Sequence, residues 1–379
     1  MHLCVISPGY PTSRTIDFVF VDQLCRAIAE RGIRVTVIAP QSITKSIFRN
    51  VPIVRRRSII PVSDGKFITL YRPFYITLGN HNRLKRFNTK AFSKSVLRAF
   101  TIIRQKPDVC YGHFWSAAHS IFPIAKQNNI PLFVSSGEEV ITHHLDYSKS
   151  EIRDIVGYVS GVISVSTNNK NENIEAGLVS EKNSIVVPNA IDTRLFHKKN
   201  KSELRQKYGY SDSDYIIAFV GQFTERKGAK RLSEALKLLN DRSIKALFMG
   251  AGGDIPDYEE ILLHGTVPHD LLADYLNCAD VFVLPTLNEG CSNAIIEAMA
   301  CGLPIISSDL PFNYDILNMD NSIMLDPHDI NAIANSIEYL KNNPTVRQEM
   351  SKNALSDASQ LTLASRAKKV IEYLEAVIL

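Results

Sequence analysis

Short apolar runs alternate with longer amphipathic stretches along the first half of the sequence. Residues 17–31 (DFVFVDQLCRAIAER) repeat apolar side chains at helical spacing, and Gly32 follows as a residue that readily ends a helix. Five runs have the length and β-branched content of buried strands: HLCVISP, RVTVIAP, PDVCYGH, PLFVSSG and GVISVST. Polar, helix-compatible segments follow the later runs. This alternation predicts a parallel sheet with helices on both faces.

The same alternation starts again in the second half of the chain, with the runs YIIAFVG, KALFMG, ILLHG, DVFVLPT and PIISSD. A chain of 379 residues is also too long for one ordinary hydrophobic core. We therefore predict an α/β protein with two Rossmann-like, doubly wound domains, residues 1–190 and 191–359. They are joined within IVVPNAIDTRLF (185–196), and a helix over about 360–379 is a candidate to pack back on the first domain.

The composition is that of a soluble globular protein, with 45% hydrophobic and 22% charged residues. The segment MHLCVISPGYP lacks the basic and long apolar regions of a signal peptide. No run approaches the roughly eighteen apolar residues of a membrane-spanning helix. The six cysteines are scattered without a CxxC pair, which argues against disulfides and a zinc site. We expect a cytoplasmic protein.

The net charge of +4 conceals a strong asymmetry. Residues 1–190 hold 24 basic and 13 acidic side chains, whereas residues 191–379 hold 19 and 26. The excess is concentrated in residues 45–106, which contain 15 basic side chains and one acidic one, Asp64. The first half of the chain is therefore suited to an anionic partner.

Within this region, residues 82–104 combine basic side chains with an apolar stripe at helical spacing: Leu84, Phe87, Ala91, Val96, Ala99 and Ile103. An ordinary surface helix packed on its own sheet has the same pattern. That interpretation does not account for the missing acids, so we hypothesise that residues 45–106 dock on an anionic membrane surface. Nucleic acid also attracts such charge, but no nucleic-acid motif accompanies it, and we expect no nucleic-acid partner.

Ligands of open parallel sheets bind beyond the carboxyl ends of the strands. Gly221 ends the run YIIAFVG, and Arg226-Lys227-Gly228 then opens a helix. Two cations at a helix start suit a diphosphate, and a solvated basic turn is the alternative. The glycines of FMGAGGD (248–254) allow close backbone approach to a ligand or form a plain strand-end turn. Ile255 occupies the last position of GxGxxG, which disfavours a nicotinamide dehydrogenase.

Residues 288–304, NEGCSNAIIEAMACGLP, place Glu289 in the loop after a strand and Glu297 about one turn into the next helix. Ser292 or Asn293 is expected to cap that helix. The two backbones should lie about 10 Å or more apart, too far for the carboxylate pair of a retaining glycosidase. Two contacts on one extended ligand fit better, with the amides of 290–293 between them. The alternative for Glu297 is a first-turn acid favoured by the helix dipole.

These residues, taken in order, resemble a known family. The E-x7-E spacing, the preceding VFVLPT and the trailing EAMACGLPIISSD match the signature of retaining GT-B glycosyltransferases of the glycogen-synthase-like group, which includes family 4 and group 1. GQFTERKG resembles the group's phosphate-binding stretch, and VPNAIDTRLF resembles its interdomain PNGID segment. The resemblance covers nearly the whole chain and implies two domains that face each other across a cleft.

The resemblance implies a role for each matching residue. Arg226 and Lys227 would bind the donor diphosphate and stabilise the leaving group, and Glu297 would hold the ribose hydroxyls. His113 would lie beside the transferred sugar, with a partly buried histidine bonded to a neighbouring carbonyl as the alternative. The donor sugar would be held by Glu289 with Gly290, Cys291, Ser292 and Asn293. The remaining donor-side positions are Gly221, Gly252, Thr266 and Val267, and the acceptor-side candidates are Gly9, Glu138 and Glu139.

The first loop, SPGYPTSRTIDF, departs from the family because Asp17-Phe18 stands about where a Gly-Gly pair is usual. A second sequence, DSD at 212–214, matches the DxD metal motif of the other glycosyltransferase fold. It precedes a strand instead of following one, so we expect a turn there. We expect no required metal and no other cofactor, because Arg226 and Lys227 take over charge neutralisation.

The sequence thus predicts a retaining glycosyltransferase that moves a sugar from a UDP- or GDP-sugar to an acceptor hydroxyl. A glycan or lipid-linked acceptor fits the basic first half, and the enzyme would then be peripheral on the inner face of the membrane. Two alternatives stay open: a nucleotide-sugar 2-epimerase on the same fold, which needs no acceptor, and a non-catalytic scaffold that binds through its basic face.

Overall fold

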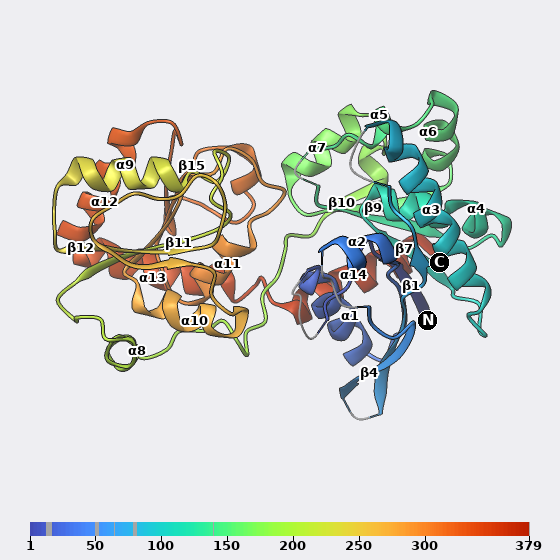
Figure 1. The fold of residues 1–379 in the computed structure, drawn as a ribbon, viewed down its shortest axis with the longest axis horizontal. Coiled ribbons are helices and arrows are strands. Elements are labelled where there is room, and N and C mark those ends of the chain that lie inside the picture. Colours follow the sequence, from blue (N-terminus) through green and yellow to red (C-terminus); the bar gives the residue numbers. More distant parts are fainter. Residues whose placement is uncertain (13–16, 50–52, 64, 79–81, 139, 379) are drawn as a thin grey trace. The chain divides into compact units, whose positions relative to one another are not determined.

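Two parallel sheets organise the chain in the computed structural model, which describes residues 1–12, 17–49, 53–63, 65–78, 82–138 and 140–378. Internal packing divides the chain into two units (Figure 1). The first unit comprises Met1–Val187 and Arg366–Leu379, and the second comprises Pro188–Ser365. Each has its own sheet and its own hydrophobic core.

The first sheet has eight strands in the order β10-β9-β8-β7-β1-β2-β5-β4. All neighbours are parallel except β4 and β5, which form an antiparallel edge. A pair of two-residue strands, β3 (Gln41–Ser42) and β6 (Phe74–Tyr75), lies outside this sheet. The strands of the sheet are β1 (His2–Ile6), β2 (Arg34–Ile38), β4 (Arg57–Ser63), β5 (Lys66–Tyr71), β7 (Val109–His113), β8 (Leu132–Ser136), β9 (Val159–Ser164) and β10 (Ser184–Val186).

Helices cover both faces of this sheet (Figure 1). The central strands are buried along their whole length, as a sheet covered on two sides requires. The helices of the first unit are α1 (Val19–Glu30), α2 (Ile43–Arg49), α3 (Asn82–Thr101), α4 (Trp115–Gln127), α5 (His143–Asp146), α6 (Lys149–Val156), α7 (Thr167–Glu175), the 3₁₀ turn η1 (Glu181–Asn183) and most of α14 (Leu363–Ile378).

The C-terminal helix α14 packs on the first sheet through an aromatic contact. The Tyr373 and Phe133 rings meet with centroids 5.9 Å apart. Gly161 makes room for the tyrosine, since a Cβ there would lie 2.4 Å from its hydroxyl oxygen. The chain therefore returns to its first unit at its end.

The second sheet has six parallel strands in the order β13-β12-β11-β14-β15-β16. Its strands are β11 (Tyr215–Val220), β12 (Ile244–Met249), β13 (Ile261–Gly265), β14 (Val281–Leu284), β15 (Ile305–Ser308) and β16 (Ser322–Leu325). The helices are α8 (Lys201–Tyr208), α9 (Ala229–Leu239), α10 (His269–Cys278), α11 (Asn293–Ala300), α12 (Ile330–Asn342), α13 (Pro344–Ala358) and the 3₁₀ turn η2 (Pro311–Asn313). Helices α9 and α12 cover one face, and α10, α11 and α13 cover the other (Figure 1).

The ten strand-like runs read from the sequence are all strands in the structure. The cationic helix over 82–104 is also present as α3, and its apolar stripe is buried only in part. Val96 and Ala99 are buried, whereas the Phe87 side chain is 47% exposed. All six cysteines are free and buried. Among the described residues, no helix is long and apolar enough to cross a membrane.

Candidate functional site

The loops that follow β11 and β14 are bound to each other at the carboxyl edge of the second sheet. The Leu287 amide donates to the Arg226 carbonyl oxygen (2.8 Å), and the Arg226 guanidinium donates to the Asn288 carbonyl oxygen (2.7 Å). Gly228 has φ +81°, and a Cβ there would lie 2.6 Å from the Pro285 carbonyl oxygen. Only glycine fits this crossing, so the end of GQFTERKG has a structural requirement in addition to any ligand.

Three residues predicted to contact the donor meet through these loops. The Lys227 ammonium forms an ion pair with Glu289 Oε1, and Arg226 Nη1 lies 3.5 Å from the same oxygen. The Thr286 hydroxyl donates to it as well, at 3.0 Å. The Glu289 side chain is only 8% exposed, and weak solvent screening strengthens these interactions. Two cations and a carboxylate thus stand where parallel sheets bind ligands, and they can hold phosphate and hydroxyl groups.

Glu297 lies on α11 and has a partner that the sequence reasoning missed. His269 Nε2, in the first residue of α10, lies 3.6 Å from Glu297 Oε1. Burial raises the pKa of Glu297, and the hydrogen bond to Glu297 raises the pKa of His269. The position of His269 just after Thr266-Val267 was the only available signal, because no sequence pattern links α10 to α11.

The start of α11 corrects one expectation. Ser292 occupies the N-cap position, but its side chain makes no capping hydrogen bond, so the predicted side-chain cap is wrong. Gly290, Cys291 and Ser292 are buried, and Asn293 is half-buried. The Cys291 carbonyl oxygen accepts from the side-chain amide nitrogen Nδ2 of Asn189 at 2.9 Å. The loop is therefore tied down by its neighbours instead of by a cap.

The backbone packing around residue 252 requires a glycine at this position. Its φ is +154°, and a Cβ would lie 2.2 Å from the Phe223 carbonyl oxygen. The Phe223 amide donates to the Ala251 carbonyl oxygen at 2.8 Å, which binds the loop after β12 to the loop after β11. This contact favours the plain strand-end turn for FMGAGGD, and a ligand role for Gly252 stays a prediction.

The other donor-side positions also lie beyond strand ends. Gly221 follows β11 directly. The aliphatic part of the Lys227 side chain lies 3.5 Å from the position that a Cβ on residue 221 would take. Thr266 and Val267 follow β13. These positions share the carboxyl edge of the second sheet with Arg226, Lys227 and Glu289.

In the first unit, His113 ends β7 and is buried. Its Nδ1 is buried without a hydrogen-bond partner among the described residues, so this nitrogen lacks the carbonyl partner of the alternative interpretation. Burial, assisted by Arg366, lowers the pKa of His113 to about 3. The imidazole is therefore neutral at physiological pH. Phe20 and Phe114 pack against it with ring centroids 5.2 and 4.7 Å away.

In the first loop, Phe18 adopts a backbone conformation with positive φ, which glycine usually occupies. Phe18, within the pair that replaces the family's usual Gly-Gly, has φ +60° at the N-cap of α1. Its ring lies over Gly9, where a Cβ would be 2.6 Å from the ring edge. Phe114 also has positive φ, +75°, at the N-cap of α4. Such backbones are strained for side-chain-bearing residues and cluster at functional sites.

Glu138, a predicted acceptor-side residue, is engaged within the protein. One carboxylate oxygen accepts from the Trp115 amide at the start of α4 (2.9 Å). The other accepts from the Ser136 hydroxyl (2.8 Å) and the Gly137 amide (2.9 Å). These bonds make Glu138 a helix-capping residue, and its acceptor role stays a prediction. Glu139 lies outside the described residues.

The DSD sequence lies in the turn before β11, as predicted. Arg205 donates to the carbonyl oxygens of Ser211, Asp212 and Asp214 there. This turn is at the amino edge of the sheet, opposite the loops that carry Lys227 and Glu289. In the part of the chain that the structure describes, no group of three or more His, Cys, Asp or Glu side chains is placed to hold a metal ion.

The sequence is similar to known proteins in both halves. The family described as "Glycosyltransferase Family 4" matches residues 18–195, and "Glycosyl transferases group 1" matches residues 200–357. TuaC of Bacillus subtilis, provisionally described as a teichuronic acid biosynthesis glycosyltransferase, is 27% identical over 353 residues. The match covers 89% of this chain and 88% of TuaC.

Solved structures share the fold. Sucrose-phosphate synthase from Thermosynechococcus elongatus superimposes with a TM-score of 0.78 at 18% identity, covering 99% of this chain and 98% of that one. HepE of Anabaena, in complex with UDP, gives 0.73 at 16% identity and covers 99% of both chains. The two parallel sheets are thus those of a GT-B fold. The chain belongs to the group 1 and family 4 glycosyltransferases.

Proposed function

We propose that this glycosyltransferase moves a sugar from a UDP- or GDP-sugar to an acceptor hydroxyl with retention of configuration. The observation that carries the proposal is the meeting of Arg226, Lys227 and Glu289 at the carboxyl edge of the second sheet. HepE, of the same fold, has been solved with UDP, which supports a nucleoside diphosphate ligand. The similarity to TuaC supports an acceptor in surface polysaccharide synthesis.

The chemistry follows from the charges. Cleavage of the sugar–phosphate bond leaves negative charge on the diphosphate, and the two cations stabilise that charge in the transition state. Glu289 orients the donor sugar, and Glu297 holds the ribose hydroxyls. With retention, the acceptor oxygen forms its bond on the face that the diphosphate leaves, and the leaving phosphate takes the acceptor proton. His113, kept neutral by burial, offers a hydrogen bond to the sugar without adding charge.

The experiment is calorimetric titration of the full chain with UDP, GDP, ADP and NAD in EDTA. One nucleoside diphosphate should bind, and Lys227→Ala should weaken it about tenfold or more, because an ammonium–phosphate contact is a charge-assisted hydrogen bond. Lys230→Ala is the matched control, since this nearby lysine is 56% exposed and pairs with Asp254. Equal binding of the wild type and Lys227→Ala, or binding of NAD alone, contradicts the proposal.

The acceptor is proposed to be lipid-linked, with the basic region 45–106 on an anionic membrane surface. Exposed apolar side chains accompany the positive charge, among them Ile47 (68% exposed) and Phe48 (84% exposed). A cavity of about 370 Å³ in the same region joins Arg56 and Arg98 to an apolar lining that includes Tyr71, Phe74 and Ile102. Cations beside apolar surface suit a phosphate group attached to a lipid.

A vesicle sedimentation assay tests this part separately. The full chain should partition on vesicles with anionic lipid and not on neutral ones, and salt should weaken the partitioning by screening. Equal sedimentation with both kinds of vesicle contradicts membrane docking, while leaving the donor site to its own titration.

A further inference from the structure

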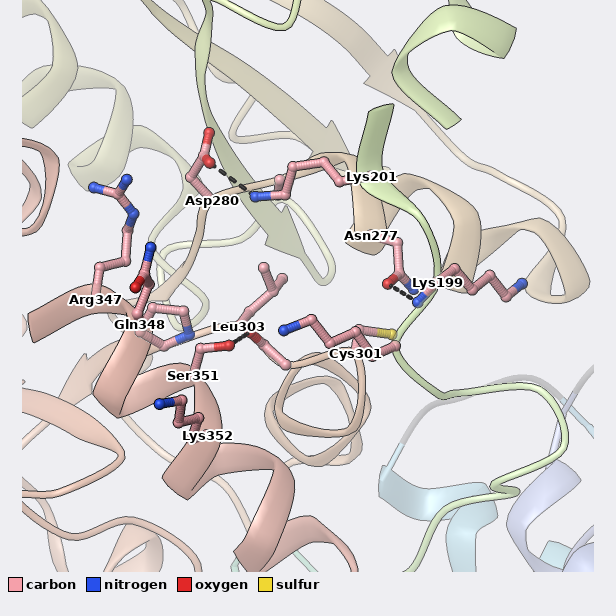
Figure 2. Close-up of a pocket in the computed structure, with 14 residues that line it drawn as sticks. Lys199, Lys201, Asn277, Asp280, Cys301, Leu303, Arg347, Gln348, Ser351 and Lys352 are labelled. Atoms are coloured by element: carbon pink, nitrogen blue, oxygen red, sulfur yellow. Dashed lines mark hydrogen bonds and ion pairs between the residues drawn. The ribbon is translucent and has the colours of Figure 1, made fainter. Parts of the chain in front are cut away.

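A second cavity opens in the second unit, away from the candidate donor residues. Its volume is about 420 Å³, and it is lined from the segment before α8, from residues preceding β14 and β15, and from the first turns of α13 (Figure 2). Asp280 and Pro304 come just before β14 and β15, whereas Glu289 follows β14. The cavity therefore lies at the amino edge of the sheet, and the donor residues lie at the carboxyl edge.

The cavity lining is strongly basic, although the second unit as a whole carries more acidic than basic side chains. Residues 188–365 contain 16 basic and 24 acidic side chains. The cavity wall reverses this balance, with one carboxylate, Asp280, and five cationic side chains: Lys198, Lys199, Lys201, Arg347 and Lys352. Gathering like charges costs free energy unless an anion offsets it.

Protein groups already neutralise part of this lining. Asp280 accepts from Lys201 and Arg205 and from the Ile216 amide, each at 2.8 Å, so its oxygens are occupied. Lys199 forms an ion pair with Asp274 at 2.7 Å. Figure 2 shows the Lys201–Asp280 pair on one side of the cavity, with Arg347, Gln348, Ser351 and Lys352 along another.

The other cations retain free hydrogen-bond donors. Within the described residues, the side chains of Lys198, Lys352 and Gln348 make no hydrogen bond or ion pair. Arg347 is held in place, because it donates to the Leu340 carbonyl oxygen at 2.6 Å and lies over the Tyr215 ring. The cavity thus combines the positive charge of Arg347, held by its hydrogen bond, with ammonium and amide donors that are available to a ligand.

We propose that this cavity binds a small phosphate-bearing molecule through Lys198, Lys352 and Gln348, beside the fixed charge of Arg347. The wall offers N–H donors and positive charge, and Asp280, the one carboxylate among its described lining residues, is occupied, so the wall complements a group that carries several negative oxygens. The volume is that of an ordinary small-molecule site. The site is separate from the donor residues and does not depend on the proposed transfer reaction.

The experiment is titration of the full chain with inorganic phosphate, pyrophosphate and glucose 1-phosphate at constant ionic strength. Binding in the Lys227→Ala background should persist, because this variant disables the donor contacts only. Lys198→Ala/Lys352→Ala should weaken binding at least tenfold, with Lys198→Gln/Lys352→Gln as a second test that keeps the side chains long. The matched control is Lys182→Ala/Lys368→Ala, which removes two exposed lysines of the first unit.

The outcomes distinguish the ligand sources. Tighter binding of glucose 1-phosphate than of inorganic phosphate assigns the site to an organic phosphate, and equal binding assigns it to the phosphate group alone. No saturable binding below about 10 mM for any of the three probes overturns the proposal. Equal affinities of the double variant and the wild type overturn it as well.

Discussion

At the scale of single residues, Glu289 competes with any anion for the two cations beside it. Its carboxylate pairs with Lys227 and lies 3.5 Å from Arg226. Glu289→Gln should therefore tighten binding of the bare nucleoside diphosphate by about tenfold, since it frees both cations. The same change should lower sugar transfer by about a hundredfold or more, because the donor sugar loses its carboxylate.

Calorimetry and a transfer assay measure the two effects of Glu289→Gln. Glu225→Gln is the control, because Glu225 pairs with Arg231 nearby while its side chain is 76% exposed. Weaker binding of the nucleoside diphosphate to Glu289→Gln would mean that the diphosphate does not lie on these cations.

The His269–Glu297 pair predicts a pH dependence of stability. Protonated His269 is stabilised in the folded state by Glu297, so its pKa is raised from 6.5. This contribution is fully present below pH 6.5 and is lost as the pH rises through the folded pKa. Burial also raises the pKa of Glu297 above 4.5, so its contribution likewise falls with rising pH, over the range between 4.5 and its folded pKa. The free energy of unfolding should therefore fall as the pH increases above 6.5, where the His269 contribution is lost.

Urea unfolding followed by circular dichroism at several pH values measures this slope. His269→Gln should flatten it, whereas His328→Gln, which changes an exposed histidine of the same unit, should leave it unchanged. An identical slope in His269→Gln and the wild type would mean that the pair does not titrate as described.

Sequence reasoning predicted which residues of the candidate site lie together better than it predicted their partners. Arg226, Lys227 and Glu289 could be grouped because each follows a strand end, and parallel strands bring such ends to one edge. His269 was missed because a side-chain pair between two helices depends on packing that no local period encodes. Ser292 had the right position for a cap, but its side chain makes no such bond.

At the scale of secondary structure, the sequence pattern predicted ten of the parallel strands and missed the edge strands β4, β10 and β16 and the parallel strand β5. β4 alternates between exposed and half-buried positions, and the basic residues around it made its apolar pattern too weak to predict a strand. The Asp64-Gly65 dipeptide between β4 and β5 was an available hairpin signal. β10 is only three residues long, too short for a reliable period.

Helix α4 depends on Glu138, which binds the Trp115 amide at its first residue. Glu138→Ala should lower the free energy of unfolding of the first unit by about 2 kcal/mol, because it removes a buried charge-assisted cap. Trp115 is the only tryptophan of the chain and lies in this unit, so its fluorescence reports on this unit selectively. Glu175→Ala, at the exposed end of α7, is the control and should stay within about 0.5 kcal/mol of the wild type. An unchanged urea midpoint for Glu138→Ala would contradict the capping role.

At the scale of the whole molecule, the proposed transfer reaction predicts that no metal ion is required. The second unit carries Arg226 and Lys227 at the candidate donor site, and we propose that these cations neutralise the diphosphate directly. Sugar transfer should therefore persist in EDTA at nearly its full rate. Loss of transfer in EDTA with recovery in manganese would contradict this.

From the exposed side chains of the first unit we predict a membrane contact that needs both positive charge and apolar side chains. Helix α2 presents Ile47 and Phe48 to solvent within the basic region 45–106. Burying two such side chains in the interface contributes about 1–2 kcal/mol each, so Ile47→Ser/Phe48→Ser should weaken partitioning on anionic vesicles at least tenfold. The matched control is Leu238→Ser/Met319→Ser, which removes two exposed apolar side chains of the second unit. If the control weakens binding as much as the α2 variant, the contact is a general apolar adhesion. A third outcome is that neither variant changes the partitioning while added salt abolishes it. The basic side chains would then act alone, because salt screens Coulomb attraction but not apolar burial.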